Sequence, residues 1–100
     1  MNIEDIKHIA VIGAGAMGHG IAQVCATAGF ETTIKDVKQE FIDIGLLKIK
    51  DSLDYLVGKE KLAPDERKDI LLNRIRGSLD TNTAVSNAQL IIEAVPEQLD

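Results

Sequence analysis

The chain has 100 residues, of which 45% are hydrophobic and 3% aromatic, and it carries a formal net charge of -5. This composition excludes a disordered chain and favours one small globular domain with an aliphatic core. The acidic balance argues against nucleic-acid and membrane partners, because both favour a basic protein face.

A single cysteine, Cys25, allows neither an intrachain disulfide nor a zinc site built from several cysteines. The first residues lack the basic and apolar stretches of a signal peptide, and no apolar run reaches the length of a membrane span. We therefore expect a cytoplasmic protein without a bound metal.

The first third of the chain predicts a strand, a helix and a second strand. Residues 7–12 are rich in β-branched residues and predict a buried strand. A helix is predicted over 16–28, with Gly29 as its stop. Residues 31–36 predict the second strand, which ends in Asp36. The apolar positions of the predicted helix are Met17, Ile21, Val24, Cys25 and Ala28.

A long helix is predicted over 38–57, because a single apolar stripe follows it. A further helix begins at Pro64, a residue that favours the first helical turn, and we expect it to extend to about Ile75. The members of the apolar stripe are Ile42, Leu46, Ile49, Leu53 and Leu56.

The remaining elements are short. Residues 77–80 predict a strand, 81–88 a helix, and 90–95 a buried strand that Pro96 ends. Glu93 lies inside that last run, where we expect a structural, hydrogen-bonded carboxylate. Alternation of strands and helices predicts an α/β fold, a Rossmann-type doubly wound parallel sheet that is incomplete at about four strands.

Three glycines, Gly13, Gly15 and Gly18, follow the first predicted strand at the spacing G-x-G-x-x-G. In this context the first permits a tight turn, the second lets a pyrophosphate approach the backbone, and the third lets the helix pack on the strand. Asp36 follows Gly13 by 23 positions. The usual separation between the loop and its ribose-binding acid is about 20.

The expected ligand is NAD. Unpaired N–H groups at the helix start, around Ala16 and Met17, face the phosphates, and Ala14 is a further cofactor-binding residue of the loop. Asp36 accepts hydrogen bonds from the ribose hydroxyls, and its charge repels the 2′-phosphate of NADP. Lys35 and Lys38 flank Asp36 and soften that repulsion. The alternative is a glycine-shaped turn in which Asp36 only caps a helix.

Two longer motifs resemble the L-3-hydroxyacyl-CoA dehydrogenase family. The first is "VIGAGAMGHGIAQV", which contains G-x-G-x-M-G-x-G-I-A, and the second is "LIIEAVPEQLD". The resemblance implies an NAD-dependent oxidoreductase of fatty acid metabolism that oxidises (3S)-3-hydroxyacyl-CoA to 3-ketoacyl-CoA. It also implies that Glu97 lies near the nicotinamide ribose, and that Ser52 and Lys59 contact the coenzyme A portion of the substrate.

The spacing within the long helix supports the last of these roles. Lys48, Ser52, Tyr55 and Lys59 are separated by four, three and four positions and therefore share one helix face. A hydroxyl and ammonium groups on that face suit a phosphate-bearing ligand. The alternative is an ordinary solvated surface.

The family's catalytic residues belong to motifs that follow the fourth strand. The resemblance therefore implies that residues 1–100 are the N-terminal part of an NAD-binding Rossmann domain, without the rest of that domain or the helical C-terminal domain. We expect the chain alone to bind NAD and to hold no catalytic residue. His8, His19 and Cys25 are read as non-catalytic. In the family, the C-terminal domain forms a homodimer interface.

Two other functions fit the same sequence. One is another NAD(P)-dependent dehydrogenase of β-hydroxyacids, since such enzymes open with a similar glycine motif. The other is a stand-alone dinucleotide-binding module without catalysis, which the short length of the chain favours.

Overall fold

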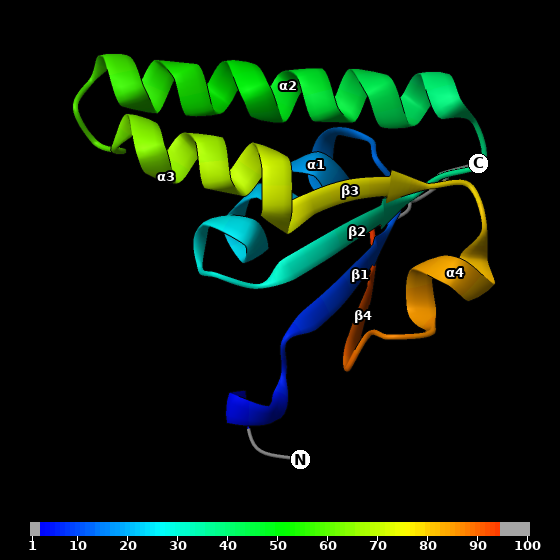
Figure 1. Ribbon diagram of the computed structural model, residues 1–100. Coiled ribbons are helices and arrows are strands. Elements are labelled where there is room, and N and C mark those ends of the chain that lie inside the picture. The colour runs from blue at the N-terminus through cyan, green and yellow to red at the C-terminus, as the bar shows by residue number, and fades with distance from the viewer. Residues whose placement is uncertain (1–2, 95–100) are drawn as a thin grey trace.

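A parallel sheet forms the centre of the computed structural model, which describes residues 3–94. Its four strands lie in the order β3-β2-β1-β4 (Figure 1). This order confirms the predicted Rossmann-type sheet, because the chain moves outward from β1 to β3 and then returns to the other side of β1. The strands are β1 (His8–Ile12), β2 (Glu31–Lys35), β3 (Ile75–Ser78) and β4 (Leu90–Glu93).

Helices cover both faces of this sheet. Right-handed crossovers put α1 and α2 on one face and α4 on the other, and Figure 1 shows α2 and α3 above the sheet with α4 below it. None of the described helices combines the length and apolar character needed to cross a bilayer. The helical segments are η1 (Ile3–Asp5), α1 (Ala16–Thr27), α2 (Gln39–Gly58), α3 (Pro64–Asp69), the π-helical turn η2 (Ile70–Arg74) and α4 (Thr81–Val85).

Helix α2 packs as its apolar stripe predicts. Ile42, Ile49 and Leu53 are fully buried, and Leu46 and Leu56 pack against the core from its edge. Both ends of the helix lie within one residue of the predicted range. The stripe is a reliable signal here because α2 makes more than five turns along one face of the sheet.

The prediction for the buried face of α1 is wrong in part. Met17 and Val24 are 68% and 70% exposed, while Gly18, Ala22 and Ala26 are buried. The reason is distance: a Cβ built on Gly18 would lie 1.6 Å from the carbonyl oxygen of Gly13. Only small residues fit where a helix backbone lies this close to its neighbour, so the larger side chains lie on the outer face.

Strand β3 begins two residues before the predicted strand. Ile75 pairs with Thr32 of β2, and the helical segment that starts at Pro64 ends in the turn η2 instead of continuing to Ile75. Gly77 belongs to the strand because its missing side chain leaves room for Ile42 of α2. A Cβ on Gly77 would lie 2.3 Å from the Cγ2 of Ile42.

Strand β4 is less buried than its sequence predicts. Leu90 and Ile91 are 40% and 48% exposed, and Glu93 is also exposed, so the prediction of a buried structural carboxylate is wrong. Among the described strands β4 pairs only with β1, and its outer edge is therefore open.

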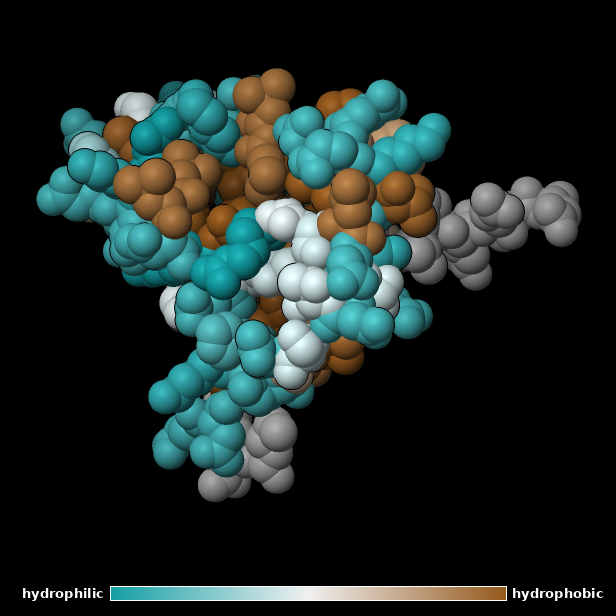
Figure 2. Space-filling model, turned by 45° about the vertical axis from the view of Figure 1, so that its right-hand side comes forward, coloured by the Kyte–Doolittle hydropathy of each residue, from teal (hydrophilic) through white to brown (hydrophobic). Residues whose placement is uncertain are grey.

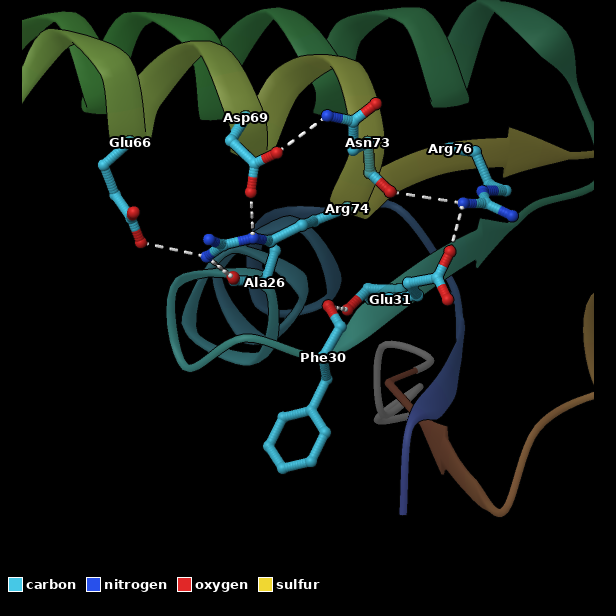
Figure 3. Close-up of polar contacts among 9 residues, drawn as sticks. Ala26, Phe30, Glu31, Glu66, Asp69, Asn73, Arg74 and Arg76 are labelled. Carbon is cyan, nitrogen blue, oxygen red and sulfur yellow. Dashed lines mark hydrogen bonds and ion pairs between the residues drawn. The ribbon is translucent and has the colours of Figure 1, made fainter. Parts of the chain in front are cut away.

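Arg74 connects the end of η2 to the end of α1 (Figure 3). Its Nε donates to Asp69 Oδ2 at 2.8 Å, and its Nη1 donates to Glu66 Oε1 and to the backbone oxygen of Ala26, both at 3.0 Å. The side chain is only 19% exposed. The Arg74 guanidinium therefore donates both to a carbonyl at the C-terminal end of α1 and to two carboxylates of α3, and so links these two helices.

Candidate cofactor site

The turn between β1 and α1 has the geometry that its glycines predict. Gly13 adopts a φ of 108°, which an L side chain rarely tolerates, and its N–H donates to the Lys35 carbonyl of β2 at 2.7 Å. Gly18 then lies in contact range of Gly13, as the Cβ construction above shows. These two glycines therefore make the tight turn and the close helix packing that the motif implies.

Gly15 leaves the start of α1 open to a ligand. It is the N-cap residue of the helix, it makes no side-chain capping bond, and nothing lies within 4 Å of a Cβ built on it. Ala16 and Met17 follow as the first helical residues, with N–H groups that have no partner inside the helix. An anion at this point meets free backbone donors and the positive end of the helix dipole.

His19 folds back onto the same turn. Its Nδ1 lies 2.8 Å from the Gly15 carbonyl oxygen. Since a carbonyl only accepts hydrogen bonds, Nδ1 is the donor in this contact. The contact fixes the Gly15 carbonyl, so His19 has a structural role in the turn.

Asp36 binds the glycine loop directly. Its Oδ2 accepts a hydrogen bond from the Ala14 N–H at 2.8 Å, and its Oδ1 accepts one from the Val37 N–H at 2.6 Å. The interpretation of Asp36 as a helix cap is wrong, because α2 has Lys38 as its N-cap residue and no side-chain capping bond. A carboxylate offers about four acceptor positions, so two remain for ligand hydroxyls.

A cavity of about 310 Å³ lies against this loop. Four of its lining residues, Gly13, Ala14, Gly15 and Asp36, were expected in the site from their spacing alone. The other four are Phe41, Ile44, Lys48 and Ala94. The cavity thus combines a polar wall of loop and carboxylate with a largely apolar wall from α2 and the end of β4.

Helix α2 forms the apolar wall of the cavity. Phe41 and Ile44 are 39% and 50% exposed, and Figure 2 shows hydrophobic surface among hydrophilic side chains at the level of α2. Lys38 places its Nζ 5.6 Å from the centroid of the Phe41 ring. The spacing of apolar residues does not indicate this wall, because Phe41 and Ile44 lie beside the apolar stripe, on the flank that faces the loop.

Gly45 is a second residue that sequence reasoning missed. A Cβ built on it would lie 3.0 Å from the Ala14 carbonyl oxygen and 3.2 Å from the Ala14 Cβ. α2 therefore packs closely on the glycine loop through this position. The available signal was a glycine placed between Ile42 and Ile49 on the buried stripe, where it has a packing reason.

The predicted substrate face meets the cavity at its first residue, Lys48. Lys48 reaches the cavity wall, whereas Ser52 accepts a hydrogen bond at 2.9 Å from the Gln23 Nε2 of α1. Lys59 follows the last residue of α2 and holds its Nζ 5.7 Å from the centroid of the Tyr55 ring. The structure thus brings the aromatic ring and one ammonium group together at the far end of this face.

Other candidate residues lie away from the cavity. His8 lies at the opposite end of β1, where its Nε2 is 3.4 Å from Glu31 Oε2. Burial raises the pKa of the Cys25 thiol, which lowers its reactivity. Glu97 lies outside the described residues. Within residues 3–94, no cluster of three or more His, Cys, Asp or Glu side chains gathers around a metal-sized centre.

Comparison with known families gives one match that covers nearly the whole chain. The family described as 3-hydroxyacyl-CoA dehydrogenase, NAD binding domain, matches residues 8–100. The open backbone at Gly15, the carboxylate of Asp36 and the adjoining cavity fit such a cofactor. NAD is therefore the ligand that both the geometry and the family indicate.

Individual relatives agree with the family match. A probable 3-hydroxyacyl-CoA dehydrogenase of Caenorhabditis elegans is 37% identical over 101 residues, covering 98% of this chain and 34% of the relative. A probable 3-hydroxybutyryl-CoA dehydrogenase of Deinococcus radiodurans is 42% identical over 87 residues, covering 87% and 30%. The chain spans about a third of the length of the curated relatives it matches.

Solved structures give the same result for the fold. The crystal structure of (S)-3-hydroxybutyryl-CoA dehydrogenase from Ralstonia eutropha is 34% identical to this chain and superposes with a TM-score of 0.87. The superposition covers 95% of this chain and 33% of that one. The four-stranded sheet and its helices thus correspond to one region of a longer chain.

Proposed function

The chain belongs to the 3-hydroxyacyl-CoA dehydrogenase family, of which it matches the NAD binding domain, and from this membership we propose that the protein that carries it oxidises (3S)-3-hydroxyacyl-CoA to 3-ketoacyl-CoA in fatty acid metabolism. Bound NAD supplies the hydride acceptor. The observation that carries the proposal is the Asp36 carboxylate, hydrogen-bonded to Ala14 of the glycine loop at the wall of a cavity.

The same geometry supports our assignment of the cofactor contacts. The pyrophosphate is bound by backbone N–H groups of the loop and of the first turn of α1, and Gly18 keeps that turn close to β1. Asp36 accepts hydrogen bonds from the adenosine ribose. The resemblance assigns Glu97 to the nicotinamide ribose. The loop and first-turn residues are Gly13, Ala14, Gly15, Ala16 and Met17.

NAD is preferred to NADP because of charge. Asp36 lies where the ribose of the adenosine half would bind, and a 2′-phosphate there would meet its carboxylate. Lys38 is one of the two lysines that flank Asp36, and its Nζ lies over the Phe41 ring, 5.6 Å from the ring centroid. Lys48 supplies a positive charge at the cavity wall. We assign it to the pyrophosphate, whose charge it offsets.

The acyl-CoA substrate is assigned to the outer face of α2. Ser52 and Lys59 provide a hydroxyl donor and an ammonium group on this face, and both suit a phosphate-bearing ligand. The catalytic base belongs to the part of the family's sequence that follows the fourth strand. The 100-residue chain alone therefore binds NAD without turning over substrate.

Location and assembly follow from the proposed family role. The whole protein acts in the cytoplasm, where NAD and acyl-CoA thioesters are available, and it forms a homo-oligomer of dimeric type. Light scattering on the full-length protein measures its oligomeric state, and a strictly monomeric protein would contradict the proposed dimer.

Asp36→Ala tests the cofactor site. Loss of the carboxylate should weaken NADH binding by roughly 1–3 kcal/mol, as expected for a charge-assisted hydrogen bond, and should raise the relative affinity for NADPH. Fluorescence titration of both nucleotides measures the effect. Asp43→Ala is the matched control, because Asp43 is an exposed acid of α2 that pairs with Gln39. Equal NADH affinity in the Asp36 variant and the wild type would remove the ribose assignment.

Substrate turnover separates the proposed function from its alternatives. The full-length protein should reduce NAD with 3-hydroxybutyryl-CoA and not with free 3-hydroxybutyrate, since the substrate contacts are assigned to the coenzyme A portion. Faster turnover of the free acid would favour a β-hydroxyacid dehydrogenase. NADH binding without turnover of either substrate would leave a binding module.

A further inference from the structure

The hydrogen bond between Gln23 and Ser52 joins α1 to α2 beside the proposed substrate face. Gln23 Nε2 donates to Ser52 Oγ at 2.9 Å, across 29 residues of sequence, and both residues are half-buried. The two helices lie side by side above the sheet. Such a bond holds the serine oxygen at a fixed place on the surface of α2.

The direction of this bond matters for what Ser52 can do next. A serine hydroxyl has one hydrogen to donate and two lone pairs that accept. Because the amide of Gln23 occupies a lone pair, the hydroxyl hydrogen remains available for an acceptor outside the protein. An anionic oxygen is the acceptor that gains most from such a donor.

The surroundings of Ser52 favour an anion. Lys59 lies on the same helix face, two turns after Ser52, and is exposed, while Lys48, one turn before Ser52, is the residue assigned to the cofactor pyrophosphate. Two acids lie nearby: Asp51 is exposed, and Asp54 is hydrogen-bonded to Lys50 and Arg67. A phosphate group bound at this face would therefore meet positive charge together with a hydroxyl donor.

We propose that Gln23 is a positioning residue for the acyl-CoA substrate: it holds Ser52 Oγ as an acceptor, so that Ser52 donates its hydrogen to a phosphate oxygen of the coenzyme A portion. This inference rests on the proposed function, which assigns Ser52 to the substrate. It adds a residue of α1, four positions after His19, that touches neither cofactor nor substrate.

Two substitutions in the full-length protein test the role. Gln23→Met removes the donor at similar volume and should weaken coenzyme A binding about fivefold, the range of one neutral hydrogen bond. Gln23→Glu keeps the shape but turns the side chain into an acceptor that takes the Ser52 hydrogen, so the loss should reach about tenfold or more. Calorimetry with coenzyme A measures both, and the KM for 3-hydroxybutyryl-CoA should rise much more than kcat changes.

The controls separate positioning from general damage. NADH affinity and Tm should change little in both Gln23 variants, whereas a residue needed only for packing would alter them as well. Gln39→Met and Gln39→Glu are matched controls, because Gln39 of α2 also bonds a side chain of its own region, Asp43, away from Ser52. Both controls should bind coenzyme A as the wild type does.

Ser52→Ala decides which assignment fails if one does. If Ser52→Ala weakens coenzyme A binding while Gln23→Met and Gln23→Glu do not, the positioning role is wrong and the substrate site stands. If Ser52→Ala has no effect, the substrate site itself is wrong. The positioning role further requires that Gln23→Met add nothing to the loss already caused by Ser52→Ala. Additive losses in the double variant would overturn it.

Discussion

Single residues of the glycine loop differ sharply in how much space they have. A Cβ on Gly18 would lie 1.6 Å from the backbone oxygen of Gly13, whereas a Cβ on Gly20 would meet nothing within 4 Å. Gly18→Ala should therefore lower the free energy of unfolding by roughly 3 kcal/mol, at the upper end for an overpacked site. Gly20→Ala should raise it by about 0.5–1 kcal/mol, because alanine is the better helix residue.

Urea denaturation of both alanine variants measures this contrast. Because Gly20 lies two residues further along the same helix, it controls for the loss of a glycine as such. Equal stability of the two variants would mean that the close contact between α1 and the turn is relaxed at little cost.

Sequence spacing predicts features that are formed within short segments of the chain. Gly13, Gly15 and Asp36 could be predicted because a tight turn, an open helix start and an acid at a strand end are properties of short segments. Gly45 and Gln23 could not, because each acts through a contact with an element far away in the sequence. The sequence alone does not indicate which distant element packs beside Gly45 or Gln23.

At the scale of the elements, side-chain hydrogen bonds of Arg74 join the segment that runs from α3 through η2 to the end of α1. Arg74→Met should lower the free energy of unfolding by roughly 1–3 kcal/mol, because the Ala26 carbonyl, Glu66 and Asp69 all lose their donor. Arg76→Met is the matched control, since Arg76 is 52% exposed and pairs with Glu31 at the surface. That exposed pair should contribute less than about 1 kcal/mol.

Thermal denaturation followed by circular dichroism compares the two arginine variants. The larger effect is expected at Arg74, where a partly buried guanidinium bridges two helical segments (Figure 3). A larger loss for Arg76→Met would show instead that the strand pair β2–β3 depends on its surface ion pair.

Element boundaries explain where the sequence prediction was wrong. The long helix α2 was found within one residue because its stripe repeats over many turns. The end of the next helix was misplaced, since Ile75 suits a helix stripe and a strand equally well. Strand pairing with Thr32 decides between them, and that partner is supplied by tertiary structure.

Acid should destabilise the whole molecule through three carboxylates. Hydrogen bonds lower the pKa of Asp54, from Lys50 first and then Arg67, and that of Asp80, from Thr83 first. The pKa of Asp69 is lowered chiefly by a hydrogen bond from Asn73, with Arg74 contributing. Because these pKa values are lower in the folded chain, the unfolded chain takes up protons first as the pH falls.

The stabilising contribution of these acids is therefore complete above the usual aspartate pKa of about 4 and is lost as the pH falls through the lowered values. Tm should decrease as the pH falls below about 4. In Asn73→Ala the decrease attributable to Asp69 should begin nearer its usual pKa, since the first donor is gone. A Tm that stays level down to the acid limit would contradict the pKa directions.

At the scale of the whole molecule, alternation of strands and helices was enough to predict the parallel sheet. Within the described residues β4 pairs only with β1, and Leu90 and Ile91 are 40% and 48% exposed. The apolar run of β4 does not indicate this exposure, because neighbouring strands are supplied by tertiary structure.

The contact of Gly45 with Ala14 has a consequence for transplantation of the motif. Residues 8–36 contain the three glycines and Asp36, yet the apolar wall and the close packing beneath Ala14 come from α2, later in the chain. A peptide or chimera that carries only residues 8–36 would contain the glycine motif and Asp36 but would lack the α2 residues that pack against them. The smallest segment of this protein that could be transferred as a nucleotide-binding unit therefore extends at least through α2, to Gly58.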